Sequence, residues 1–445
     1  MTQNPQRAAF LADQRWFAGK GRDFEIGEVR VIARLGEHVR LELVEVRYAD
    51  GVPEVETYQM PVSAYDAPQE RLAHALVREG DGEWTYDAVH DKDAMAVFLE
   101  AFDAAAELDE VRFHRLPGHD LDTDAHSTLF GGEQSNSSLA FGEDSLLKFF
   151  RRLTPGANPD VEIHEALTRA GNSHVAALYG YLSTDDGGLQ LAILQQFLRT
   201  ASDGWDLALA SARNLFTEGD LHADEVGGDF AAEAHRLGQT LASVHASLAE
   251  AFGTAAFDGA STAQVMQRRL EAATAVVPEL AEHPLADRFA AVADLTGEVH
   301  RVHGDLHLGQ TLRTSLGWKL VDFEGEPAKD LAERRLPDSP WRDVAGMVRS
   351  FDYAASAVAR DLGAAGESAA QIAYRAGEWT AHNTHAFLAG YTEERGHPMT
   401  AEEELLLSAY VADKAVYEVV YESRNRPGWR GIPLSALGRL TEVIA

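Results

Sequence analysis

A short stretch of the chain, VHGDLHLGQTLR, combines a histidine, an aspartate and an amide at spacings that suit phosphoryl transfer. His303 precedes Asp305 by two residues, and Gln310 follows Asp305 by five. Kinase catalytic loops have this order, because the aspartate accepts the proton of the attacking hydroxyl and the amide oxygen binds a metal ion. We therefore predict Asp305 as the catalytic base, Gln310 as a metal ligand and His303 as part of the acceptor site.

The segment LVDFEGEP, which follows, places a carboxylate directly after an apolar run. Asp322 would lie at the end of a strand, where a metal-binding carboxylate neutralises phosphate charge through Mg²⁺. Glu324 is a further candidate ligand for the same ion. Taken singly, each acidic residue is also compatible with a purely structural role in capping a turn.

Upstream, GGEQSNSSLAF joins small and hydroxyl-bearing residues to an expected strand. Backbone N–H groups and short side chains at Gly131, Gly132, Ser135, Asn136, Ser137 and Ser138 would let phosphate oxygens approach closely. The plain alternative is an ordinary polar turn before a strand. The stretch is therefore a candidate phosphate loop only in combination with the residues that follow it.

Lys148 lies within the next apolar run, SLLKFF. In kinases a lysine on the strand after the phosphate loop holds the α- and β-phosphates and pairs with a helix carboxylate. Glu162 and Glu165 lie in the helix expected next and are the candidates for that carboxylate. By strand alternation alone, Lys148 would instead point to solvent.

The C-terminal stretch YEVVYESRNRPGW is the best candidate for the acceptor site. On a helix its aromatic and polar side chains form two neighbouring stripes: Tyr417, Tyr421 and Arg424, and Glu418, Glu422 and Asn425. Aromatic faces beside carboxylates, amides and guanidinium groups suit a sugar ring. A helix that packs its tyrosines into the core would show the same spacing.

The elements that must position these residues are strands in the first half and helices in the second. Alternating runs over residues 23–62 predict an antiparallel sheet with a turn at Asp50–Gly51 and a helix at 8–16 before it. A helix is expected at 92–106 and strands at SSLAF, SLLKFF, HVAALYGYLS and LQLAILQQFL. Asn158, Pro159 and Gly171 mark the start and end of the helix between these strands. From about residue 205 helical periodicity dominates, which gives an α+β fold with two lobes.

Composition excludes several classes of protein. The 445 residues carry a formal net charge of −32, which disfavours nucleic acid and anionic lipid as partners. The chain has no cysteine, so disulfides, thiolate metal sites and cysteine nucleophiles are excluded. With no apolar run long enough to cross a membrane and no signal-peptide pattern, we expect a cytoplasmic protein. We also expect it to be a monomer.

The combined motifs resemble the aminoglycoside phosphotransferase-like, or eukaryotic-kinase-like, superfamily, and within it the maltokinases and their actinobacterial sugar-kinase relatives. The resemblance extends over nearly the whole chain through QRWFAGKGR, DLHADEVGGDF, SPWRDVAGMVRSFDYAA and YEVVYESRNRPGWRGIPL. It implies a bilobal protein-kinase-like fold with an antiparallel β cap domain (1–90), an intermediate nucleotide-binding domain (91–200) and a helical C-lobe (201–445). Lys148, Glu162, Asp305, Gln310 and Asp322 then match the phosphate-holding lysine, its partner, the base and the metal ligands.

Lobe order places the adenine of ATP against the strand LAILQQFL, near Gln195 and Phe197. Two departures from the broader superfamily are Gln310 in place of an asparagine and DFEGEP in place of a DFG triplet. The resemblance implies an ATP- and Mg²⁺-dependent sugar kinase, with maltose giving maltose 1-phosphate as the main expectation. A glucosamine kinase is the first alternative. A catalytically inactive kinase-fold binding protein is the second.

Overall fold

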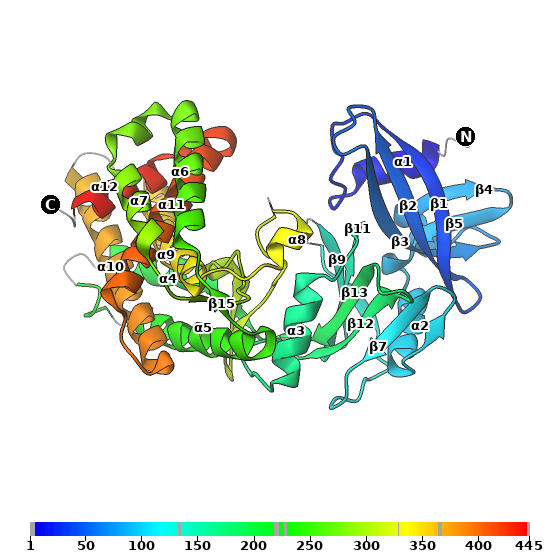
Figure 1. The fold of residues 1–445 in the computed structure, drawn as a ribbon. Helices are drawn as coiled ribbons and strands as arrows, with labels where there is room; N and C mark the ends of the chain where they lie inside the picture. The colour runs from blue at the N-terminus through cyan, green and yellow to red at the C-terminus, as the bar shows by residue number, and fades with distance from the viewer. Residues whose placement is uncertain are drawn as a thin grey trace. The chain divides into compact units, whose positions relative to one another are not determined.

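The computed structural model describes residues 5–131, 135–217, 222–226, 229–327, 329–363 and 367–442. The chain divides into two compact units (Figure 1). The N-terminal unit comprises Met1–Glu165 and Ala176–Arg199, and the C-terminal unit comprises Ala166–Val175 and Thr200–Ala445. The predicted boundary between a cap and a nucleotide-binding domain at residue 90 stays a prediction.

The N-terminal unit is built mainly of antiparallel strands. Its strands are β1 (Phe24–Leu35), β2 (Val39–Tyr48), β3 (Val55–Tyr65), β4 (Leu76–Gly80), β5 (Glu83–Asp87), β6 (Glu107–Leu108), β7 (Val111–Arg115), β8 (Ser127–Leu129), β9 (Asn136–Phe141), β10 (Ser145–Phe150), β11 (Arg152–Leu153), β12 (Leu178–Thr184) and β13 (Gln190–Gln196). The helices are α1 (Pro5–Asp13), α2 (Lys92–Asp103) and α3 (Pro159–Arg169), with 3₁₀ turns at Glu70–Ala75 and Ala88–His90.

Two sheets organise this unit. The first has the order β1-β2-β3-β5-β4, with β11 paired to β3, and the second has the order β6-β7-β12-β13-β10-β9-β8. The side chains of β2 contribute to two hydrophobic cores, one on each face of the sheet. Val39, Leu41 and Leu43 face the core that contains α2. Val44 and Val46 face the core that contains α1. Because side chains of a strand alternate between faces, this sheet is apolar on both sides.

The turn and helix-capping residues on either side of Lys148 adopt the conformations that the sequence predicts. The hairpin β9–β10 turns at Gly142, whose φ of +57° lies in the left-handed region that glycine adopts at little cost. Helix α3 begins at Pro159, and the side chain of Asn158 accepts a hydrogen bond from the N–H of Asp160 at 2.9 Å. The N-terminal helix ends at Asp13 rather than Trp16, because Trp16 and Phe17 leave the helix to pack into the core with Tyr58.

The C-terminal unit is mainly helical. Its helices are α4 (Gly204–Thr217), α5 (Ala231–Phe252), α6 (Gly259–Val276), α7 (Leu285–Ala290), α8 (Leu331–Arg334), α9 (Pro340–Asp361), α10 (Glu367–Arg395), α11 (Ala401–Asn425) and α12 (Gly431–Glu442). Short strands are β14 (Ser202–Asp203), β15 (Ala255–Ala256), β16 (Glu298–Val299), β17 (Thr311–Thr314) and β18 (Gly317–Leu320), and 3₁₀ turns lie at Pro278–Glu282, Ala291–Asp294, Leu308–Gln310 and Pro427–Trp429.

Glycines allow the helices of this unit to approach one another closely. A Cβ atom at Gly390 of α10 would lie 2.0 Å from the carbonyl oxygen of His235 on α5. A Cβ atom at Gly346 of α9 would lie 2.4 Å from the carbonyl oxygen of Leu306. Both distances are too short for any other residue, so α9 rests directly on the segment that follows Asp305. Among the described residues, no helix is long and apolar enough to cross a membrane.

Candidate active site

The segment that carries Asp305 is held by a buried carboxylate on α9. The N–H groups of His303 and Gly304 donate to Oδ2 and Oδ1 of Asp343, each at 2.8 Å. His245 of α5 contacts Oδ2 of the same carboxylate through Nε2 at 3.1 Å. Burial would raise the pKa of Asp343, but the bonds from His245 and the backbone N–H groups outweigh it and lower the pKa. Asp343 therefore stays ionised and fixes the path of this loop.

The side chain of His303 is buried against the segment that carries Asp322. Its Nε2 is 3.0 Å from the carbonyl oxygen of Val321, and its ring packs against Phe323 with centroids 4.7 Å apart. Only 2% of the residue is exposed. These contacts tie the Asp305 loop to the segment that carries Asp322, while the predicted contact of His303 with substrate stays a prediction.

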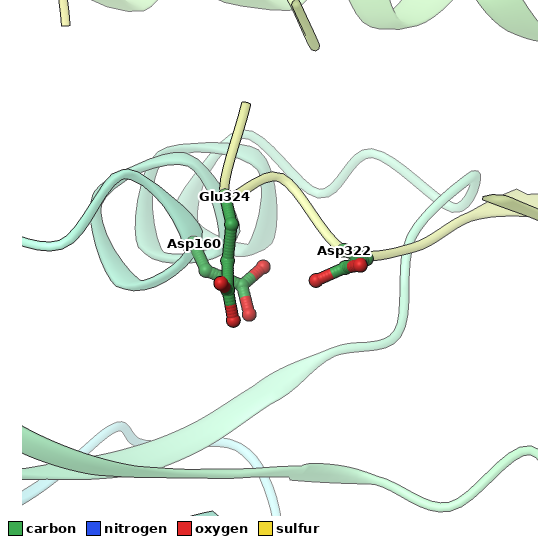
Figure 2. Close-up of side chains that lie close together, drawn as sticks. All are labelled: Asp160, Asp322 and Glu324. Atoms are coloured by element: carbon green, nitrogen blue, oxygen red, sulfur yellow. The ribbon is translucent and has the colours of Figure 1, made fainter. Parts of the chain in front are cut away.

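The predicted metal ligands of the C-terminal unit lie together. Nε2 of Gln310 donates to Oδ2 of Asp322 at 3.2 Å, and the N–H of Val321 donates to the carbonyl oxygen of Gln310 at 3.1 Å. Asp322 has a φ of +65°, a costly conformation for a residue with a side chain and one that recurs at functional sites. This backbone directs its carboxylate toward that of Glu324, with oxygens of the two within 4.8 Å (Figure 2).

This donor set fits Mg²⁺, which prefers carboxylate and amide oxygens. Asp322 and Glu324 supply carboxylates and Gln310 supplies an amide. The third side chain drawn in Figure 2, Asp160, comes from the first turn of α3 in the N-terminal unit.

Asp305 lines a cavity of about 270 Å³ within the C-terminal unit. The wall is formed by the Asp305 loop, by α11 and α9, and by the segment after Asp322; the lining residues are Arg269, Gly304, Asp305, Leu306, Glu326, Lys329, Arg342, Gly346, Tyr410, Asp413, Lys414 and Tyr417. On α11, Nζ of Lys414 donates to Oδ1 of Asp305 at 3.1 Å. This lysine was not among the residues predicted from the sequence, although it precedes Tyr417 by three residues on the same helix.

Of the residues predicted to bind the acceptor on α11, Tyr417 lines this cavity. Glu418 instead accepts hydrogen bonds from Nε and Nη2 of Arg349 at 2.8 and 2.7 Å. Glu422, which is 1% exposed, accepts from Nε and Nη2 of Arg426 at 3.0 and 2.6 Å. The two carboxylates are thus neutralised by neighbouring guanidinium groups, and their contact with substrate stays a prediction.

The other three predicted residues of α11 are exposed. The ring of Tyr421 stacks on that of Tyr417 with centroids 6.3 Å apart, and its side chain is 44% exposed. Asn425 donates to the carbonyl oxygen of Tyr421 at 2.9 Å, and Arg424 lies on the surface. None of Tyr421, Arg424 and Asn425 is among the residues that line the cavity at Asp305.

In the N-terminal unit, Lys148 is buried rather than solvent-exposed. Its Nζ donates to Oδ2 of Asp160 at 3.2 Å, and Asp160 also lies 3.1 Å from Nδ1 of His164. The partners expected from the sequence were Glu162 and Glu165; Asp160, two residues before Glu162, was not among them. The assignment of Glu162 stays a prediction.

The remaining predicted nucleotide contacts come from the segment before β9, from the start of β9 and from the end of β13. Gly132 lies outside the described residues, while Asn136 Nδ2 donates to Ser135 Oγ at 3.3 Å. The hydroxyl of Ser137 accepts from Nε of the buried Arg151 at 2.8 Å, which is a structural contact. On β13, Oε1 of Gln195 is buried with no hydrogen-bond partner among the described residues.

Phe197 follows β13. Its N–H donates to the carbonyl oxygen of Asp144 at 2.7 Å, and its ring packs against Phe130 with centroids 5.6 Å apart. These contacts fix the end of the strand predicted to receive adenine. Nucleotide binding by Gln195 and Phe197 stays a prediction.

The chain is similar in sequence to one family of cap domains and to glucosamine kinases. Residues 10–91 match the family described as the maltokinase N-terminal cap domain. The chain is 30% identical over 389 residues to a glucosamine kinase of Streptacidiphilus jiangxiensis, covering 83% of this chain and 80% of that one. It is 28% identical over 326 residues to a glucosamine kinase of Mycolicibacterium smegmatis, covering 70% and 78%.

Solved structures agree on the fold. A glucosamine kinase in complex with glucosamine, ADP and inorganic phosphate superposes with a TM-score of 0.71 at 23% identity, over 99% of this chain and 100% of that one. A second crystal form of a glucosamine kinase gives a TM-score of 0.70 at 23% identity, over 97% and 98%. The predicted kinase-like α+β fold, with N-terminal antiparallel sheets and a helical C-terminal region, is confirmed.

Proposed function

Because this chain belongs to the maltokinase and glucosamine kinase family of the aminoglycoside phosphotransferase-like superfamily, we propose that it phosphorylates glucosamine with ATP. At the level of reaction class, the chain is a phosphotransferase that acts on a sugar hydroxyl. Two relatives matched over most of their length are glucosamine kinases, which favours the amino sugar over the maltose expected at first. The inactive-scaffold alternative is set aside, since both relatives are kinases.

The observation that carries the proposal is the placement of Asp305 in a cavity of the C-terminal unit, the unit that also contains the Gln310–Asp322 pair. In the proposed reaction, the acceptor hydroxyl of the sugar gives its proton to the Asp305 carboxylate as its oxygen forms a bond to the γ-phosphorus of ATP. The bond from that phosphorus to the β,γ-bridging oxygen breaks, and ADP leaves with the electron pair. Asp305 acts chiefly by orienting the hydroxyl, since phosphoryl transfer passes through a loose transition state.

Lys148 is proposed to provide a cation for the phosphates of the nucleotide. Gln310, Asp322 and Glu324 would hold Mg²⁺, which when bound neutralises phosphate charge. The conformation of Asp322 and its bond from Gln310 orient its carboxylate without the ion.

The cavity at Asp305 also bears on acceptor size. Its volume of about 270 Å³ corresponds to about nine waters at roughly 30 Å³ each. That space is sufficient for a monosaccharide. Glu326 lines the same cavity and provides a carboxylate that can receive an ammonium group.

The proposal is tested by ADP release with Mg²⁺-ATP over a panel of glucosamine, maltose, glucose and kanamycin. We expect the highest kcat/KM with glucosamine, and detection of a glucosamine phosphate by mass spectrometry. A preference for maltose would restore the first expectation, which the cap-domain match at residues 10–91 favours. Absence of turnover with every sugar would contradict the kinase assignment.

A further inference from the structure

Lys414 of α11 is the cation that contacts the proposed base. Its Nζ lies 3.1 Å from Oδ1 of Asp305, although the two residues are 109 positions apart in the sequence. Their side chains are 28% and 24% exposed, respectively, and both line the cavity of about 270 Å³. The pair is therefore accessible from the space that the acceptor would occupy.

The surroundings of Lys414 keep it charged. Burial would lower its pKa, but the negative charges of Asp305, Glu326 and Glu418 outweigh this effect and raise the pKa. Its Nζ also lies 5.8 Å from the ring centroid of Tyr417, one turn further along α11. An ammonium held between carboxylates and an aromatic face has little freedom to turn away.

The two carboxylate oxygens of Asp305 differ in their hydrogen bonding. Oδ1 accepts from Lys414, whereas Oδ2 accepts no hydrogen bond within the part of the chain that the structure describes. A carboxylate that must receive the proton of a hydroxyl needs one oxygen available and the other held, because free rotation would misplace the acceptor. The loop backbone is already fixed by Asp343, so the side-chain torsion of Asp305 is the freedom that Lys414 restricts.

We propose that Lys414 is a positioning residue for phosphoryl transfer, which holds Oδ1 of Asp305 so that Oδ2 receives the proton of the acceptor hydroxyl. This inference rests on the proposed function of Asp305. Lys414 exchanges no proton in the step: the hydroxyl proton passes to Oδ2, and the ammonium remains bound to Oδ1. If the partly buried ion pair had a purely structural role, its loss would lower the unfolding free energy but leave the kcat of the folded protein nearly unchanged.

The test compares Lys414→Met and Lys414→Arg with the wild-type chain in the full-length protein. We expect Lys414→Met to lower kcat by about 10²-fold with KM for ATP within about two-fold, because the loss concerns orientation and not nucleotide binding. Lys414→Arg keeps a cationic donor and should recover part of kcat. Arg236→Met is the matched control, since Arg236 pairs with Glu233 at 2.8 Å on α5, outside the cavity.

A double-mutant cycle separates positioning from a structural role. If Lys414 acts through Asp305, Lys414→Met should change kcat in the Asp305→Asn background by less than about two-fold. Equal effects in both backgrounds, or a kcat of Lys414→Met within about two-fold of wild type, would overturn the inference. A variant that loses its thermal unfolding transition is replaced by Lys414→Gln, to which the same limits apply.

Failure of the inference about Lys414 can be distinguished from failure of the proposed function. If the wild-type chain phosphorylates maltose or glucose and not glucosamine, the acceptor assignment fails and the Lys414 comparison is made with the active sugar. If no sugar is phosphorylated, the comparison is made on slow ATP hydrolysis, with water as the acceptor. Hydrolysis that is unchanged by Lys414→Met, or absent altogether, would overturn the inference about Lys414.

Discussion

The buried carboxylate of Asp343 binds the backbone N–H of Gly304, the residue before the proposed base, at 2.8 Å. The contact joins α9 to a loop 39 residues earlier in the chain. Gly304 has a φ of +85°, so the turn that presents Asp305 depends on a glycine as well as on this carboxylate. The backbone path that leads into Asp305 is thereby set from α9.

Asp343→Asn should therefore impair both stability and turnover. The amide presents an NH₂ group toward one of two backbone N–H donors, so one buried donor loses its acceptor, at a cost of about 1–3 kcal/mol in unfolding free energy. Displacement of Asp305 should lower kcat by about 10²-fold. Urea unfolding and ADP release check this, with the exposed Asp287→Asn as control. A variant as active and stable as the control would refute the role assigned to Asp343.

Asp305→Asn should abolish most turnover while nucleotide binding is retained. The amide cannot take the hydroxyl proton, whereas the predicted phosphate contacts at Lys148 and Asp322 are unaltered. We expect kcat to fall roughly 10³-fold or more, with little change in ADP affinity. Kinetics and calorimetry measure the two quantities, and a comparable loss of ADP affinity would show that Asp305 serves nucleotide binding instead.

Asp322→Asn should raise the Mg²⁺ concentration required for activity. Replacing a carboxylate by an amide removes a charged ligand, and we expect the half-saturating concentration to rise at least about tenfold. Gln310→Ala should act in the same direction, because it removes the donor 3.2 Å from Asp322. Rates measured across a magnesium titration decide this, and unchanged curves in both variants would place the metal elsewhere.

His307 predicts a pH dependence of stability. Burial lowers the pKa of His307 below its ordinary value of 6.5, and Nδ1 of the neutral ring accepts from the N–H of Gly309 at 3.1 Å. The unfolded chain therefore takes up a proton at higher pH than the folded one. Unfolding free energy should fall as pH decreases below about 6.5, until the lower folded pKa is reached.

His307→Asn removes this titration and keeps a side-chain oxygen for the N–H of Gly309. Urea unfolding between pH 5 and pH 7 should show a smaller slope of unfolding free energy against pH in the variant than in wild type. Identical slopes would mean that His307 has the same pKa in both states.

Glu326→Gln should discriminate between acceptors. Glu326 lies 3.6 Å from Nη2 of Arg342 and lines the cavity at Asp305. If it receives the ammonium of glucosamine, loss of its charge should raise KM for glucosamine about tenfold, since hydrogen bonds to charged groups contribute about 1.5–3 kcal/mol. KM for glucose, which has no ammonium, should change little. An equal rise for both sugars would assign Glu326 to a shared hydroxyl or to folding.

The sequence by itself determined the features that depend on residues close together in the chain. The spacing of His303, Asp305 and Gln310 predicted the catalytic segment, which stays a prediction, and the apolar run before Asp322 placed that residue after a strand. Asn158 and Pro159 marked the start of α3 because capping involves only the next few residues. Strand alternation and helical periodicity, which are equally local, were sufficient for the confirmed fold class.

Only the tertiary structure decided which charges meet. Glu418 and Glu422 looked available for a sugar, yet Arg349 and Arg426 neutralise them. Lys148 binds Asp160, which helix spacing had not singled out, since the candidates from the sequence were Glu162 and Glu165. Lys414 reaches Asp305 only because α11 packs beside the loop. Such pairings depend on how distant segments pack. A buried charge needs a partner of opposite charge, and packing decides which partner lies close enough. Short-range patterns in a single sequence do not contain that information.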